Sequence, residues 1–216
     1  MNIAILGTGM VGSTIGSKMI QLGHQVKMGS RTAGNEKALA WVKEAGANAS
    51  QGTFAEAAAF GELAFNCTSG SGSLEALALA GTGNLKGKIL IDASNPLDFS
   101  KGMPPSLSVC NTDSLGERIQ KAFPDTKVVK SLNTTNANQM VAPAELAGGD
   151  HTMFLCGNDA EAKAKVLDLL KHGFGWKDVV DLGDITASRG QEMILPLWLR
   201  LWGTLKTPAF NFKIVR

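Results

Sequence analysis

Three glycines near the start of the chain, Gly7, Gly9 and Gly12, have the spacing of a loop that holds a diphosphate. In such a loop the first glycine permits a tight turn, the second lets the phosphates approach the backbone, and the third lets a helix pack closely on a strand. The free N–H groups and the positive dipole end of the next helix then face the anion. The chemistry expected here is the binding of a dinucleotide.

The flanking elements supply the context that this glycine pattern requires. Residues 3–6 form a continuous apolar run, as in a strand buried on both faces of a parallel sheet. A helix is expected over residues 11–22, ended by Gly23, and a second strand begins near Gln25. Because strand, glycine turn and helix follow one another in this order, we interpret the turn as a nucleotide site and not as a purely structural loop.

The end of the second strand indicates which dinucleotide binds. About twenty residues after the glycines, an NAD site usually has a carboxylate on the ribose 2′-hydroxyl. The residues here are Ser30, Arg31 and Thr32, with Lys37 one short turn later. A guanidinium binds a 2′-phosphate bidentately, whereas a carboxylate would repel it. The sequence therefore predicts NADP(H) over NAD(H); the alternative is that Arg31 and Lys37 are only solvated surface charges.

The composition is that of an ordinary globular protein. The chain has 216 residues, of which 44% are hydrophobic and 19% charged, and its net charge of +2 gives no basis for binding nucleic acid. Cys67, Cys110 and Cys156 are scattered and odd in number, which predicts reduced thiols in a cytoplasmic protein. The chain begins with a strand and not a basic leader, so no signal peptide is predicted. The most apolar stretch, residues 193–202, is too short to cross a bilayer.

Strands and helices alternate along the rest of the chain. Strands are predicted at 47–49, 62–67, 88–92, 127–132, 152–156 and 179–183, and helices at 35–45, 54–60, 74–79, 114–122, 160–171 and 187–205. Thr53 and Glu56 form a predicted capping box, and Thr112 or Asp113 is predicted to cap the helix at 114–122. This alternation predicts an α/β fold, a doubly wound and mostly parallel sheet of the Rossmann type. We divide it into a nucleotide-binding domain, residues 1–147, and a short C-terminal extension, residues 148–216.

The predicted last helix, residues 187–205, is apolar on more than one face. Such a helix needs a second surface beyond its own sheet. We expect that surface to belong to a second copy of the chain, which makes the protein a homodimer through this helix.

Several motifs together resemble the NADPH-dependent reductases of coenzyme F420, a deazaflavin, and their bacterial relatives. The resemblance spans nearly the whole chain. The motifs that carry it are residues 7–12, 29–31, 128–134, 156–159, 195–198 and 210–213.

The resemblance implies an oxidoreductase that transfers a hydride between NADP(H) and a flavin-like acceptor, a small molecule stacked over the nicotinamide. It implies that Thr8, Gly9, Met10 and Val11 hold the pyrophosphate and that Ser30, Arg31 and Lys37 hold the 2′-phosphate. The residues expected to line the nicotinamide side are Thr68, Ser69, Leu74, Asn95, Asn133 and Thr134. The loop at 68–73 is rich in serine and glycine where family members carry bulkier residues, and it is either part of the site or a plain flexible loop.

Such a hydride transfer needs neither a nucleophile nor a metal, because the cofactors carry the chemistry. The protein must hold nicotinamide C4 about 3–3.5 Å from the acceptor atom. We therefore name no catalytic residue and no metal site. We interpret the three isolated histidines, His24, His151 and His172, as surface or capping residues. We interpret Asp92, Asp98 and Glu192 as ordinary charges.

Three other functions compete with this prediction. β-Hydroxyacid and imine reductases share the N-terminal fold but add a large helical domain, and the stretch after the predicted strand at 127–132 is shorter than a second domain usually is. A soluble NADPH-dependent flavin or ferric reductase fits the same motifs. A non-enzymatic NADP-binding sensor also fits, because the motifs argue for a nucleotide site more strongly than for turnover.

Overall fold

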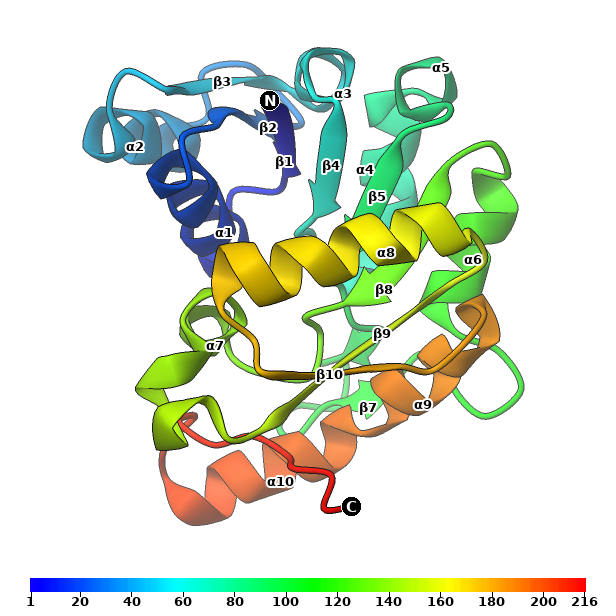
Figure 1. Ribbon diagram of the computed structural model, residues 1–216. Helices are drawn as coiled ribbons and strands as arrows, with labels where there is room; N and C mark the ends of the chain where they lie inside the picture. The colour runs from blue at the N-terminus through cyan, green and yellow to red at the C-terminus, as the bar shows by residue number, and fades with distance from the viewer.

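One eight-stranded sheet runs through the computed structural model, which describes residues 1–216 (Figure 1). The strand order is β10-β9-β8-β5-β4-β1-β2-β3, and all neighbours are parallel except β8 and β9. Outside this sheet, the short strands β6 and β7 pair with each other in antiparallel orientation. The strands are β1 (Asn2–Leu6), β2 (Gln25–Ser30), β3 (Ala49–Thr53), β4 (Leu63–Asn66), β5 (Ile89–Asp92), β6 (Leu97–Asp98), β7 (Ser106–Leu107), β8 (Lys127–Ser131), β9 (Thr152–Gly157) and β10 (Asp178–Asp181).

Helices connect these strands on both sides of the sheet. The α-helices are α1 (Met10–Gln21), α2 (Glu36–Ala45), α3 (Phe54–Phe60), α4 (Ser73–Ala80), α5 (Thr82–Leu85), α6 (Leu115–Ala122), α7 (Ala137–Val141), α8 (Ala160–Asp168), α9 (Ser188–Met193) and α10 (Leu195–Leu205). The short 3₁₀ turns are η1 (Gly70–Gly72), η2 (Pro143–Glu145), η3 (Ala147–Gly149) and η5 (Ile185–Ala187), and a π-helical turn, η4 (Leu169–Phe174), follows α8.

The strands alternate their side chains between two separate cores. In β1, Ile3 and Ile5 pack on one face with α1, α2, α7 and α8, whereas Ala4 and Leu6 pack on the other with α3, α4, α5 and α6. All four side chains are fully buried, as expected for a parallel strand covered on both faces. The predicted doubly wound, mostly parallel α/β fold is confirmed.

The parallel strands deliver their following loops to one edge of the sheet. The chain winds outward from β1 in both directions, because β1 pairs with β2 on one side and β4 on the other. Ligands of open α/β sheets bind in the crevice outside the carboxyl ends of the strands at such a reversal point. The loops that meet there follow β1, β2 and β4.

The C-terminal part extends the same sheet. β9 runs antiparallel to β8, with Lys130 opposite Cys156, and β10 pairs with β9 at the outer edge. Figure 1 shows α10 and the final tail running along the end of the molecule below β9 and β10. The backbone N–H of Thr152 donates to the carbonyl of Phe212 at 2.9 Å, which ties the tail to the start of β9.

Three local predictions need correction or support. The helix predicted at 187–205 is two helices, since Pro196 lacks an N–H group and its ring would crowd the carbonyl four residues earlier. Ser114, and not Thr112 or Asp113, caps α6, because its hydroxyl accepts the N–H of the third helical residue. The capping box of Thr53 at the start of α3 is confirmed.

None of the helices has the length and apolar character needed to cross a membrane.

Candidate functional site

A cavity of about 370 Å³ lies between the loops that follow β1, β2 and β4. It brings together eight of the residues predicted from the sequence: Gly7, Thr8, Gly9, Ser30, Arg31, Thr32, Thr68 and Ser69. It also has five wall residues that the sequence did not single out: Asn35, Phe54, Cys67, Gly72 and Ala76. The apolar wall formed by Phe54 and Ala76 could only be found from the packing of α3 and α4 on the sheet.

The glycine turn has the geometry of a diphosphate cradle. Gly7 has a φ of +123°, and a Cβ there would lie 2.6 Å from the carbonyl oxygen of Cys67. A Cβ on Gly12 would lie 2.2 Å from the carbonyl oxygen of Gly7, so α1 can start this close to the strand only with glycine. The space beside Gly9 is open, with no atom within 4 Å of an added Cβ. A diphosphate can therefore approach the backbone at Gly9.

The start of α1 is prepared for an anion. Its N-cap is Gly9, no side chain caps the free N–H groups, and the first turn has no acidic residue. Unsatisfied N–H groups and the helix dipole both attract negative charge at this end. Met10 and Val11 lie in this first turn, with Met10 largely exposed at 75%. The residues present thus fit the pyrophosphate of a dinucleotide.

The cationic side of the cavity comes from the loop after β2. Arg31 lines the cavity, and the Ser30 hydroxyl donates to the carbonyl of Thr32 at 2.6 Å, which shapes the turn. Lys37 lies in the first turn of α2, exposed, and its side chain is not part of the cavity wall. Its backbone N–H donates to the capping side chain of Asn35 at 3.1 Å. The predicted phosphate contact of Lys37 therefore stays a prediction.

Thr68 is held in place by a buried amide. Its hydroxyl donates to Oδ1 of Asn66 at 2.7 Å and lies 2.8 Å from the hydroxyl of Ser73. The amide nitrogen of Asn66 in turn donates to Oδ1 of Asp92 at 2.8 Å. A fully buried carboxylate thus orients a threonine in the wall of the cavity through one intervening side chain.

Behind this wall lies a buried ionic cluster that the sequence did not reveal. Nζ of Lys130 lies 2.8 Å from Oδ2 of Asp92, 2.9 Å from Oε1 of Glu192 and 2.6 Å from the carbonyl of Ser94. The side chains of Lys130, Asp92 and Glu192 have almost no exposed surface. Desolvation alone would lower the pKa of Lys130, but its two carboxylate partners outweigh this and raise that pKa above the ordinary lysine value. The interpretation of Asp92 and Glu192 as ordinary charges was wrong.

The surplus negative charge of the cluster is balanced by a helix end. Glu192 accepts the backbone N–H of Leu115 at 2.8 Å and that of Gly116 at 3.0 Å. These groups belong to the first turn of α6, where a carboxylate is stabilised by free donors and by the helix dipole. Glu192 therefore joins α9 directly to α6 and β8, and through Lys130 to Asp92 of β5.

Three of the residues expected on the nicotinamide side, Asn95, Asn133 and Thr134, form a second group next to this cluster. Asn95 donates to the carbonyl of Asn133 at 2.8 Å, and Nδ2 of Asn133 donates to Oδ1 of Asn95 at 2.9 Å. Oδ1 of Asn133 and the hydroxyl of Thr134 are buried and have no hydrogen-bond partner. Buried polar atoms of this kind are what a polar ligand or a water molecule satisfies. Leu74 lies in α4 and is 38% exposed. Of the residues expected on the nicotinamide side, Thr68 and Ser69 line the 370 Å³ cavity, whereas Leu74, Asn95, Asn133 and Thr134 do not.

The thiol of Cys67, in the wall of the cavity, is inert. Burial, and secondarily the charge of Asp92, raises the pKa of the Cys67 thiol far above its usual range, so the thiol stays protonated. His151, which we interpreted from the sequence as a surface or capping residue, is buried. Its Nε2 lies 2.9 Å from the carbonyl of Pro143, and its ring packs edge-on against Trp176 with centroids 4.8 Å apart.

Gly70, in the serine–glycine loop after β4, is required for a steric reason. A Cβ on Gly70 would lie 2.0 Å from the carbonyl oxygen of Asn95 and 2.9 Å from Cα of Pro96. The loop therefore packs directly on the turn that carries Asn95, and a bulkier residue cannot occupy this position without moving that turn.

Gly70→Ala is expected to lower the free energy of unfolding by about 1–3 kcal/mol, the usual cost of an added group in a packed region. The matched control is Gly83→Ala in α5, where an added Cβ meets no atom within 4 Å. Alanine there should be neutral or stabilising by up to about 1 kcal/mol. Urea denaturation of both variants measures this, and equal stability of the two would contradict the packing argument.

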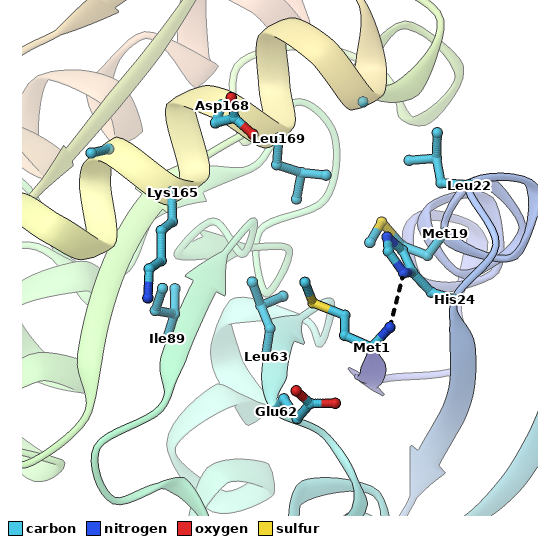
Figure 2. Close-up of a pocket in the computed structure, with 12 residues that line it drawn as sticks. Met1, Met19, Leu22, His24, Glu62, Leu63, Ile89, Lys165, Asp168 and Leu169 are labelled. Atoms are coloured by element: carbon cyan, nitrogen blue, oxygen red, sulfur yellow. Dashed lines mark hydrogen bonds between the residues drawn. The ribbon is translucent and has the colours of Figure 1, made fainter.

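A larger cavity, about 810 Å³, opens at the opposite edge of the sheet. Figure 2 shows Met1, Met19, Leu63, Ile89 and Leu169 around this space, which lies at the amino ends of β4 and β5. Its lining is apolar around the centre, and the glycine turn is not part of its wall. The smaller cavity at the carboxyl edge is therefore the candidate dinucleotide site.

The fold and the glycine cradle define a dinucleotide-binding protein of the Rossmann class. A sequence model of the family described as "NADP oxidoreductase coenzyme F420-dependent" matches residues 2–96. A crystal structure of a candidate F420-dependent NADP reductase from Arthrobacter sp. FB24 is 53% identical, with a TM-score of 0.96 and 100% of both chains covered. The chain belongs to the family of F420-dependent NADP oxidoreductases, and the resemblance seen in the sequence is confirmed.

Two further relatives show how far the likeness extends. The F420-dependent NADP reductase of Methanocaldococcus jannaschii is 32% identical over 135 residues, which are 60% of this chain and 57% of that protein. The chain thus matches little more than half of the length of this curated relative. A reductive aminase from Aspergillus terreus superposes with a TM-score of 0.66 at 19% identity, over 95% of this chain and 62% of the other. That likeness shows the fold alone.

Proposed function

We propose that the protein transfers a hydride between NADP(H) and a flavin-like acceptor such as coenzyme F420. The choice of NADP(H) as the nucleotide is supported by one observation: Arg31 lies in the wall of the cavity, at the position where NAD sites have a carboxylate. The acceptor part is supported by the family and by relatives whose names include F420. The domain boundary at 147 belongs to the same proposal, with residues 148–216 completing the acceptor side.

In this proposal each part of the site has one task. The open space at Gly9 and the free N–H groups of α1 receive the diphosphate, and Arg31 receives the 2′-phosphate. NADP(H), when bound, supplies the hydride chemistry itself. Thr68 orients the inner end of the nucleotide, since its own hydroxyl is held by Asn66. The unpartnered oxygens of Asn133 and Thr134 are acceptors for polar groups of the nicotinamide or of the acceptor.

The acceptor is tested by a parallel assay of hydride transfer from NADPH to F420, FMN, FAD, ferric chelates, and small imines and keto acids. The expected result is turnover with F420 or another flavin-like acceptor. Activity only with imines or keto acids would contradict the proposal. Tight binding of NADPH without turnover on any acceptor would favour a sensor.

We also propose that a second copy of the chain covers α10. Leu195 and Trp198 of this helix are buried, whereas Leu197, Trp202 and Leu205 are 52%, 41% and 51% exposed. Large apolar side chains that lie together on one helix surface are typical of an interface between subunits. The cytoplasmic location predicted from the sequence remains part of the proposal, because all three cysteines are free.

A further inference from the structure

Arg31, which lines the dinucleotide cavity, forms an ion pair with Glu75, a residue that is not itself part of the cavity wall. Nε of Arg31 lies 3.3 Å from Oε1 of Glu75, and Nη2 lies 3.4 Å from Oε2. Glu75 is in the first turn of α4, whose Ala76 lines the same cavity. A Cβ on Gly72 would lie 3.8 Å from Nη2, so the guanidinium rests against the start of this helix.

We propose that Glu75 sets the affinity for the phosphorylated ribose by competing with the 2′-phosphate for Arg31. The inference rests on the proposed function, in which Arg31 binds that phosphate. A guanidinium presents its Nε–Nη2 edge to carboxylate and to phosphate in the same bidentate geometry. With Glu75 on this edge, the phosphate must either displace the carboxylate or bind beside it against like-charge repulsion. Both routes reduce the affinity for NADP(H) and leave NAD(H) unaffected.

The exposure of the pair determines the size of the effect. The side chains of Arg31 and Glu75 are 64% and 62% exposed. Ion pairs this exposed are weak and open readily, so Glu75 adjusts the affinity and does not block the site. Adding the repulsion that Glu75 exerts on the bound phosphate, we expect a change of about threefold to tenfold.

Glu75→Gln tests this by calorimetric binding of NADPH, NADH, 2′-AMP and 5′-AMP to the full chain. The expected result is about threefold to tenfold tighter binding of NADPH and 2′-AMP, with less than about twofold change for NADH and 5′-AMP. The control is Glu44→Gln on the exposed side of α2, which removes the same charge without a contact to Arg31. It should leave all four affinities unchanged.

The Glu75→Gln substitution in the Arg31→Ala variant separates competition for Arg31 from a general electrostatic effect of the Glu75 charge on the nucleotide. In Arg31→Ala, adding Glu75→Gln should give a clearly smaller gain for NADPH than in the wild type, because the contested cation is gone and only the repulsion between Glu75 and the phosphate is relieved. An equal gain in that background, or unchanged or weaker NADPH binding in Glu75→Gln alone, would overturn the inference. If Arg31→Ala itself leaves the preference for 2′-phosphorylated ligands intact, the proposed phosphate site fails instead. The two failures are therefore distinguishable.

Discussion

Lys130→Met is expected to lower the free energy of unfolding by about 3–5 kcal/mol. The variant removes the only cation of the cluster and leaves Asp92 and Glu192 buried around an apolar side chain. Two carboxylates without a counter-ion cannot both keep their charge in such surroundings, and water cannot replace the lost ammonium in a site with almost no exposed surface. For a chain of this length the loss corresponds to a fall in melting temperature of roughly 6–20 °C.

Two matched variants make this prediction specific to the buried charge. Lys121→Met removes a lysine from the exposed side of α6 and should change stability by less than about 0.5 kcal/mol. Neutralising the cluster in one chain, with Asp92→Asn, Glu192→Gln and Lys130→Met, should recover part of the lost stability, because no uncompensated charge remains. Chemical denaturation of the three proteins provides the comparison. A triple variant less stable than Lys130→Met would show that uncompensated charge is not what destabilises the single variant.

Arg31→Ala is expected to weaken NADPH binding by about ten- to a hundredfold while changing NADH binding by less than about twofold. The magnitude is that of one or two hydrogen bonds between a cation and a phosphate, about 1.5–3 kcal/mol together. The difference arises because only NADPH carries the 2′-phosphate. Release of Glu75, which now has no partner, adds a small further repulsion against the phosphate.

The control for Arg31→Ala is Arg118→Ala. Arg118 is also a half-exposed arginine in an ion pair, with Nε 2.8 Å from Oδ2 of Asp113, but it lies on α6 away from the cavity. Its loss should leave both affinities unchanged. Titration of each variant with both nucleotides by fluorescence or calorimetry measures the effect. Equal weakening of NADPH and NADH in Arg31→Ala would remove Arg31 from the phosphate site.

The sequence by itself determined the fold class and most of the loop residues that line the candidate dinucleotide cavity. The glycine turn, its strand and its helix are contiguous. Backbone contacts within that unit or with the segment after β4 require glycine at Gly7 and Gly12, and Gly9 leaves the backbone open to a ligand. Arg31 could be placed because it directly follows β2, and the carboxyl ends of parallel strands meet at one edge. The capping box at Thr53 is equally local. Such features depend on residues close together in the chain, so the sequence pattern alone predicts them.

Only the tertiary structure decided which charges are buried and which walls enclose the ligand. Asp92, Lys130 and Glu192 come from three distant segments, and each is an unremarkable charge until the sheet and α9 close around it. The pairing of Arg31 with Glu75 likewise requires α4 to stand beside the end of β2. A charged residue type indicates exposure on average, and it becomes a buried partner only where packing supplies a counter-ion and donors. Those partners are set by the contacts between elements, which no local pattern encodes.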